Sequence, residues 1–83
     1  MTREEVYKAL DSERGYQAKW GDNDHSPEEF FMYMEDYINE AKHILSREAN
    51  EIGRPRSMDI MRKVTALGVA AIEQHGCTRR EGF

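Results

Sequence analysis

Cysteine, proline and histidine are scarce in this chain, whose 83 residues include one Cys, two Pro and three His. The single cysteine, Cys77, has no partner in the chain for a disulfide, and the chain has no set of Cys and His residues with the spacing of zinc ligands around it. Long apolar runs are also missing, since no segment reaches the roughly 18 residues that a membrane-spanning helix requires. Residues 1–5 are too charged for a secretory signal. We therefore expect a cytoplasmic protein without a membrane partner.

Positive charge is not in excess, because 12 Lys and Arg stand against 16 Asp and Glu, for a net charge of −4. No general field draws the protein to nucleic acid, although the tail over residues 77–83 is locally basic through Arg79 and Arg80. A domain of this size buries only about 60–65% of the surface of its unfolded chain. The charge therefore does not predict nucleic acid as a partner. The small size of the domain predicts a second copy of the chain as one.

Helical periodicity accounts for nearly the whole chain, which has no strand-like alternation, internal repeat or low-complexity segment. We predict an all-α single domain over residues 1–83, with helices at about 3–20, 27–52 and 57–75. The third helix is apolar around its whole circumference in its middle part. We therefore expect a homo-oligomer to complete the helical bundle.

Capping residues predict where the first two helices begin. Thr2 and Glu5 have the spacing of a capping box, in which each side chain binds the backbone N–H of the other residue. Ser26 and Glu29 repeat this spacing, and Pro27 occupies the first helical position, where its missing N–H costs nothing. The second of these boundaries is the more strongly predicted.

Glycine and proline predict the remaining boundaries. Gly53 and Pro55 are expected to stop the second helix after Ile52. The third helix can then begin at Ser57, and Gly76 is well placed as the left-handed residue just beyond its end.

The middle of the third helix, residues 64–72, predicts an interface between subunits. Gly68 costs about 1 kcal/mol relative to Ala in a helix interior. Its presence favours close approach by another helix, which could belong to a second copy. The predicted interface residues are Val64, Leu67, Gly68, Ala71 and Ile72.

Three polar residues fall on apolar stripes. Glu13 and Gln17 lie on the stripe of the first helix, and Glu48 lies on that of the second. Buried polar groups require partners. Two interpretations stay open: a structural network of ion pairs, or a polar pocket between helices. The basic residues available to such a network are Arg14, Arg54, Arg62 and Lys63.

A candidate ligand site surrounds the end of the first helix. An aromatic platform, a cation and the free N–H groups of a helix start suit a phosphate-bearing ligand with a flat base. The predicted ligand-binding residues are Tyr16, Gln17, Lys19, Trp20 and His25. In the alternative interpretation, Trp20 covers the core and His25 is a simple turn residue.

Carboxylates crowd the second helix, where Mg²⁺ is the alternative ligand. Hard oxygen donors of this kind bind Mg²⁺. The alternative metal set is Glu35, Asp36 and Glu40, on the polar side of the helix where charges are ordinarily solvated.

Several short motifs together resemble a small helical protein type found in phages and bacterial genomes. They span roughly residues 10 to 80 and are Glu13-Arg14, Tyr16-Gln17, Lys19-Trp20-Gly21, His25-Ser26, Arg62 to Leu67, and Glu73 to Gly76. That type is in turn faintly similar to the MazG-like all-α nucleoside triphosphate pyrophosphohydrolases. This similarity implies a dimeric or tetrameric helical architecture and a carboxylate helix that binds Mg²⁺.

The metal motif of those enzymes is incomplete in this chain. They hold Mg²⁺ with Glu-x-x-Glu and a later Glu-x-x-Asp. The positions three residues after Glu35 and Asp36 are Ile38 and Asn39, and no Glu-x-x-Asp occurs. A site without half of its carboxylates balances the charge of a metal-bound triphosphate poorly.

We therefore expect a non-enzymatic phage-type accessory protein without a cofactor. Its predicted partner is a nucleotide or cyclic nucleotide, or a host defence protein in an anti-defence role in the host cytoplasm. Two alternatives stay open: a reduced Mg²⁺-dependent pyrophosphohydrolase, and an acidic inhibitor that docks on another protein.

Overall fold

The computed structural model describes residues 1–19 and 24–81. This part of the chain forms three helices and no strand: α1 (Arg3–Lys19), α2 (Pro27–Arg47) and α3 (Gly53–His75). The predicted all-α fold of one small domain is confirmed. The predicted end of the first helix at Trp20 lies outside the described residues.

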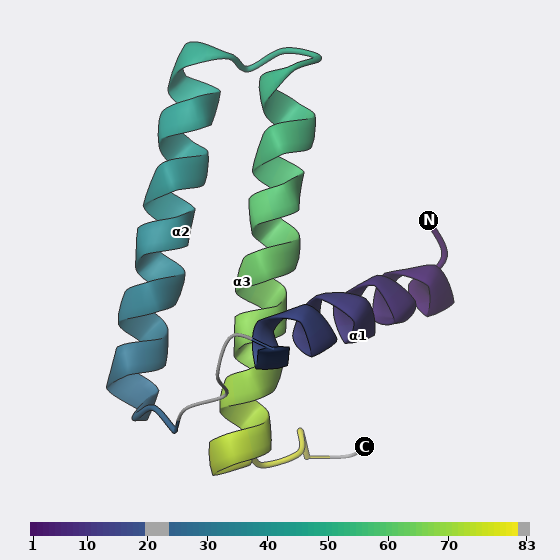
Figure 1. Cartoon of the computed structure of the whole chain (residues 1–83), viewed down its shortest axis with the longest axis vertical. Helices are drawn as coiled ribbons and strands as arrows, with labels where there is room; N and C mark the ends of the chain where they lie inside the picture. Colours follow the sequence, from purple (N-terminus) through teal and green to yellow (C-terminus); the bar gives the residue numbers. More distant parts are fainter. Residues whose placement is uncertain (20–23, 82–83) are drawn as a thin grey trace.

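Helices α2 and α3 form an antiparallel hairpin, and α1 crosses α3 on one side of that hairpin (Figure 1). Helix α1 contacts α3 but not α2. It therefore depends on a single helix for its placement. The short connection between α2 and α3 lies at the end of the hairpin away from α1 (Figure 1).

The predicted boundary between the second and third helices is wrong. Helix α2 ends at Arg47 rather than Ile52, and α3 begins at Gly53 rather than Ser57. The side-chain oxygen of Asn50 accepts hydrogen bonds from the N–H groups of Ile52 and Gly53, at 2.9 and 3.1 Å. These bonds satisfy donors that the first turn of a helix leaves without partners.

Gly53 and Pro55, expected to terminate a helix, instead belong to the first turn of α3. Proline is tolerated there because its missing N–H would have no partner within the helix. Gly53 is buried, and a Cβ atom at this position would collide with the backbone carbonyl of Glu48. The glycine therefore permits the two helix ends to lie against each other.

The predicted capping boxes are both present. The backbone N–H of Glu5 donates to Thr2 Oγ1 at 3.2 Å, and that of Thr2 donates to Glu5 Oε1 at 3.3 Å. At α2 the reciprocal distances between Ser26 and Glu29 are 3.0 and 3.2 Å. Gly76 ends α3 with φ of 73°, as predicted.

The core is small for a chain of this length. The buried apolar residues of the described part are Phe30, Ile60, Val64, Ala66 and Ala70. The accessible surface is 6857 Å², whereas a compact monomer of 9.7 kDa has about 5,100 Å². The radius of gyration is 14.2 Å, against about 12 Å for a compact domain of 83 residues. The fold is therefore more open than its size requires.

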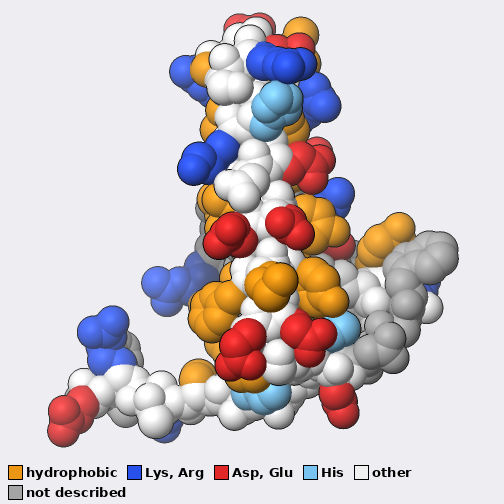
Figure 2. All heavy atoms as spheres, turned by 90° about the vertical axis from the view of Figure 1, so that its left-hand side faces the viewer, with side chains coloured by type: hydrophobic (Ala, Val, Ile, Leu, Met, Phe, Trp, Pro, Cys, Tyr) orange, Lys and Arg blue, Asp and Glu red, His pale blue; other side chains and the backbone are white. Residues whose placement is uncertain are grey.

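Large apolar side chains are exposed on α2. Phe31, Met32 and Ile38 are each more than two-fifths exposed. Figure 2 shows hydrophobic side chains along this helix between groups of acidic ones. Burial of such side chains would stabilise the fold, but a single chain leaves them in solvent.

Candidate functional site

Polar side chains attach α1 to α3. Helix α1 has no buried residue, so apolar packing alone does not hold it. The guanidinium of Arg14 pairs with the Glu73 carboxylate at 2.9 Å. The side-chain amide of Gln17 donates to the backbone carbonyl of Lys63 at 3.3 Å. The face of α1 that carries the apolar stripe, with its polar residues Glu13 and Gln17, is therefore the face that contacts α3.

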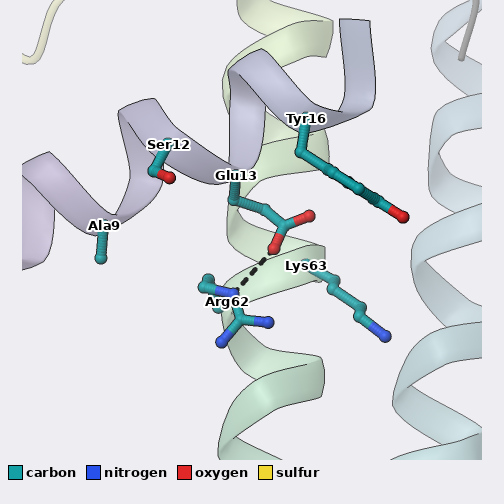
Figure 3. A pocket seen from close by; sticks show the side chains of 6 residues that line it. All are labelled: Ala9, Ser12, Glu13, Tyr16, Arg62 and Lys63. Atoms are coloured by element: carbon teal, nitrogen blue, oxygen red, sulfur yellow. Dashed lines mark hydrogen bonds and ion pairs between the residues drawn. The ribbon is translucent and has the colours of Figure 1, made fainter. Parts of the chain in front are cut away.

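The shortest of these contacts joins Glu13 and Arg62 (Figure 3). Arg62 Nε donates to Glu13 Oε1 at 2.7 Å. The Glu13 side chain is 10% exposed and that of Arg62 is 39% exposed. The hydrogen bond to Glu13 is the main reason why the pKa of Arg62 is raised. This ion pair is therefore partly desolvated, and it orients the guanidinium.

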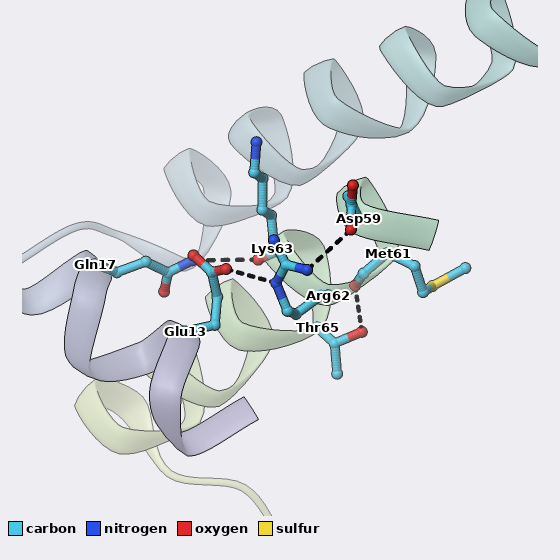
Figure 4. A network of polar contacts seen from close by, with 7 residues as sticks. All are labelled: Glu13, Gln17, Asp59, Met61, Arg62, Lys63 and Thr65. Atoms are coloured by element: carbon cyan, nitrogen blue, oxygen red, sulfur yellow. Dashed lines mark hydrogen bonds and ion pairs between the residues drawn. The ribbon is translucent and has the colours of Figure 1, made fainter. Parts of the chain in front are cut away.

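Asp59 holds Arg62 from a second direction (Figure 4). Its carboxylate accepts from Arg62 Nη1 at 3.0 Å, three residues away on α3. Arg62 Nη2 has no hydrogen-bond partner among residues 1–19 and 24–81. The guanidinium is thus fixed in position while one of its nitrogens still has donors available.

A cavity of about 570 Å³ lies in the angle between α1 and α3. It is lined by Ala9, Ser12, Glu13, Tyr16, Arg62 and Lys63 (Figure 3). This volume lies within the range of small-molecule sites, which is about 300–1,000 Å³. With two cationic side chains and one carboxylate, the lining carries a net charge of about +1 in a protein of net charge −4. Asp59, which is not part of the lining, also binds Arg62 and offsets this excess, so Lys63 is the lining cation that no described carboxylate pairs with.

Gln17 leaves one polar atom without a partner beside this ion pair. Its Oε1 is buried and accepts no hydrogen bond from the part of the chain that the structure describes. The bond from Nε2 to the Lys63 carbonyl fixes which way the amide points. A buried acceptor of this kind requires a donor from outside the described residues, such as water or a ligand.

The predicted ligand-binding residues do not share one location. Tyr16 lines the cavity, and Gln17 binds the backbone of α3. Lys19 is exposed at the end of α1 and is not part of the cavity lining. Trp20 lies outside the described residues. His25 precedes α2 and contacts residues of α2 and α3 instead.

His25 joins the start of α2 to the end of α3. Its backbone N–H donates to Gln74 Oε1 at 3.1 Å, and its carbonyl lies 2.6 Å from Nε2 of His75. Its ring makes edge contacts with Phe30 and Tyr33. These interactions give His25 a structural role in closing the open end of the hairpin.

Glu48 does not converge with Glu13 and Gln17. It follows the last residue of α2, and its Oε2 lies 3.6 Å from Arg56 Nη1, beyond hydrogen-bond distance. It lines a separate small cavity that also includes His43. The three predicted polar residues therefore lie in two places. Glu13 and Gln17 lie against the middle of α3, and Glu48 lies near its start.

The alternative metal residues are also divided. Asp36 and Glu40 line one cavity of about 360 Å³, and Glu35 is not part of its lining. Within residues 1–19 and 24–81, no group of three His, Cys, Asp or Glu side chains is arranged to hold a metal ion. No helix in these residues is both long and apolar enough to cross a membrane.

The predicted interface residues face three directions. Val64 is buried in the chain, and Leu67 lines the cavity beside Asp36 and Glu40. Gly68, Ala71 and Ile72 line an apolar cavity between α2 and α3.

Five residues that line the α1–α3 site were not predicted from the sequence as ligand-binding, although Glu13 was predicted to lie in a polar network or pocket. They are Ala9, Ser12, Glu13, Arg62 and Lys63. Ala9, Ser12 and Tyr16 have spacings of three and four, which place them on one face of a helix. That spacing was a usable signal for α1, but nothing in the sequence indicates which residues of α3 lie opposite.

No protein-family model, curated protein or solved structure matches the chain.

Proposed function

We propose that this protein is a non-enzymatic binding protein for a small anionic molecule with a flat ring, of nucleotide or cyclic-nucleotide type. The observation that carries the proposal is the cavity between α1 and α3, which places Tyr16, Arg62 and Lys63 around one space of about 570 Å³.

The two cations suit a phosphate group. Glu13 and Asp59 hold Arg62, so little side-chain entropy is lost when its remaining N–H groups bind an anion. A guanidinium binds phosphate through a planar set of donors. Lys63 has no carboxylate partner in the described residues and supplies a second positive charge. Together they would bind one phosphate between a fixed fork and a mobile ammonium group.

Tyr16 suits the flat part of the ligand. Its side chain extends from α1 toward the same side of the cavity as Lys63 (Figure 3), and the residue is 57% exposed. Stacking of a base on an aromatic side chain contributes about 1–3 kcal/mol. The ring and the ammonium group would therefore bind the base and the phosphate of one ligand.

The test is thermal unfolding of the purified protein against nucleoside mono-, di- and triphosphates and cyclic mono- and dinucleotides, followed by calorimetry on any that stabilise it. A ligand at 100 times its dissociation constant stabilises the folded protein by about 2.7 kcal/mol. We expect at least one of these compounds to raise the melting temperature. If none does so at millimolar concentration, the proposal is wrong.

Matched variants locate the binding site. Tyr16→Ala and Lys63→Ala are each expected to weaken binding about tenfold or more, by loss of stacking or of a charge-assisted contact. The controls are Tyr7→Ala and Lys42→Ala. Tyr7 is as exposed as Tyr16 on the same helix, and neither control residue lines the cavity. Equal loss in test and control variants would place the ligand elsewhere.

A second candidate function rests on the acidic side chains of α2. They stand in groups along the exposed side of this helix, with apolar side chains between them (Figure 2). Such a surface suits a basic protein partner, which the phage-type resemblance would make a host defence protein. This candidate predicts no stabilisation by any nucleotide and salt-sensitive binding of the partner.

The enzymatic alternative is tested separately. Nucleoside triphosphates are incubated with the protein and Mg²⁺, and released pyrophosphate is measured. Release that Glu35→Gln abolishes would replace the binding proposal with a reduced pyrophosphohydrolase.

A further inference from the structure

The α2–α3 hairpin carries an apolar surface, which we call the back face. Phe31, Met34, Gly68 and Ile72 line its hollow, and the exposed Ile38 and Met61 continue the same helical stripes, four residues from Met34 and seven from Gly68. The described linings of this hollow and of the α1–α3 cavity have no residue in common. The back face is therefore separate from the α1–α3 cavity.

The back face contains both a hollow and a projection. The hollow has a volume of about 340 Å³, and Gly68 and Ala71 contribute its α3 side. Phe31 and Ile72 also line it, and they are 71% and 52% exposed. Among residues 1–19 and 24–81, no Asp, Glu, Lys or Arg lines the hollow. An exposed aromatic side chain thus lies next to an uncharged hollow.

Gly68 has no role within one chain that requires a glycine. A Cβ atom there would meet only the terminal methyl group of Met34, at 3.8 Å, which is an ordinary contact. A glycine in a helix interior nevertheless costs about 1 kcal/mol relative to Ala. Its effect is to deepen the hollow, which is useful when a side chain from outside the chain enters it.

The surface of the chain is large enough to supply an interface. Its 6857 Å² exceed the value for a compact monomer by about 1,700 Å², and a stable interface needs about 800 Å² from each partner. The buried core consists of only five apolar residues in the described part. Small domains with such cores commonly depend on oligomerisation for stability. A partner that completes the core must be present whenever the chain folds, and a second copy meets this condition.

Charge limits where a second copy can bind. Two molecules of net charge −4 repel each other, so close approach costs least at an uncharged surface such as the lining of this hollow. A two-fold dimer requires a surface that is complementary to itself. The projecting Phe31 beside the hollow at Gly68 provides both halves of such a contact.

We infer that two copies of this chain pair through their back faces, and that Phe31 of each copy enters the hollow at Gly68 of the other. The four helices α2 and α3 of the two copies then form one bundle, with each α1 on its outside. Because the described linings of the α1–α3 cavity and of the hollow share no residue, dimerisation and ligand binding can succeed or fail separately.

Sedimentation velocity and native mass spectrometry of the full chain test this inference. We expect a mass of twice 9.7 kDa at micromolar concentration. Gly68→Leu fills the hollow, and Phe31→Glu places a charge in it, so each should weaken dimerisation about tenfold or more. The inference is wrong if the wild-type protein is a monomer. It is also wrong if both variants dimerise as tightly as the wild type.

Two matched controls accompany these variants. Gly15→Leu adds the same side chain on α1, where a Cβ would meet nothing within 4 Å. Met32→Glu adds the same charge next to Phe31, at a residue that is 67% exposed and does not line the hollow. Both controls should remain dimers, and loss of the dimer in either of them assigns the interface to another surface.

Thermal unfolding of the wild type provides a readout that needs no variant. The melting temperature of a dimer whose folding and association are linked rises with protein concentration. A melting temperature that does not change over a hundredfold concentration range contradicts the inference.

Discussion

The side chains of Glu13 and Arg62, 49 residues apart in the sequence, meet at 2.7 Å where α1 crosses α3. This ion pair has two effects. It attaches a helix that has no buried residue, and it fixes a guanidinium at the edge of a cavity. The stability of α1 and the shape of the proposed ligand site therefore depend on the same contact.

Arg62→Met should destabilise the protein by about 1–2 kcal/mol, because it leaves the Glu13 carboxylate partly buried without its partner. The value is set below that of a fully buried pair because Arg62 is 39% exposed. In a domain of this size, 1 kcal/mol lowers the melting temperature by about 4–8 °C. The measurement is urea unfolding followed by circular dichroism. Asp59→Asn is the control, and it should cost less than about 0.5 kcal/mol because Asp59 is 63% exposed.

Gly53→Ala should destabilise the protein by about 1–3 kcal/mol, since the new methyl group would collide with the Glu48 carbonyl. Gly15→Ala should have the opposite effect and stabilise α1 by about 0.5–1 kcal/mol, because the space beside this helical glycine is open. Chemical unfolding of the two variants in parallel measures both changes. Equal changes in stability for the two variants would show that the close approach of Gly53 to the Glu48 carbonyl does not affect stability.

Ser26→Ala should cost about 1 kcal/mol, because it removes the hydroxyl that accepts from the backbone N–H of Glu29. Ser46→Ala is the control, since the Ser46 hydroxyl bonds a carbonyl near the end of α2 and caps no N-terminus. Melting temperatures of the two variants should differ by several degrees. A similar change in both would show that loss of a hydroxyl, rather than loss of a cap, is what the experiment measures.

Stability should fall at acid pH partly through Glu29. The hydrogen bond from the backbone N–H of Ser26, followed by that from the Ser26 hydroxyl, lowers the pKa of Glu29 from its ordinary value of 4.5. A lowered pKa in the folded state means that the contribution is present above about pH 4.5 and is lost as pH falls through the folded pKa.

The variant Glu29→Gln tests this pH dependence. Its melting temperature should be below that of the wild type near neutral pH, and the difference should shrink below about pH 4.5. Glu28→Gln removes a charge from the same turn without touching the capping box, so its difference from the wild type should change less over this range. If the difference in melting temperature between Glu29→Gln and the wild type stays constant over this pH range, the lowered pKa of Glu29 does not contribute to stability.

Several features of the fold were predictable because they depend on residues close in sequence. A capping box needs only two residues three positions apart, so the starts of α1 and α2 were correctly predicted from Thr2 and Ser26. Gly76 likewise marks the end of α3 through its own backbone conformation. Gly53 and Pro55 misled because both residues occur at helix starts as well as at helix ends. The side chain of Asn50 decided between the two.

The candidate site was only partly predictable. The stripe of α1 showed that Glu13 and Gln17 would face another helix, and they do. The sequence by itself thus determined the helical class, the starts of α1 and α2, the end of α3 and the unusual polarity of this stripe, since these follow from local hydrogen bonds and from the helical period. Only the tertiary structure decided that Arg62 and Lys63 lie opposite Glu13 and Tyr16, and that His25 lies with the end of α3. Such pairings depend on the angle at which two helices cross, and that angle is set by packing between residues far apart in the chain.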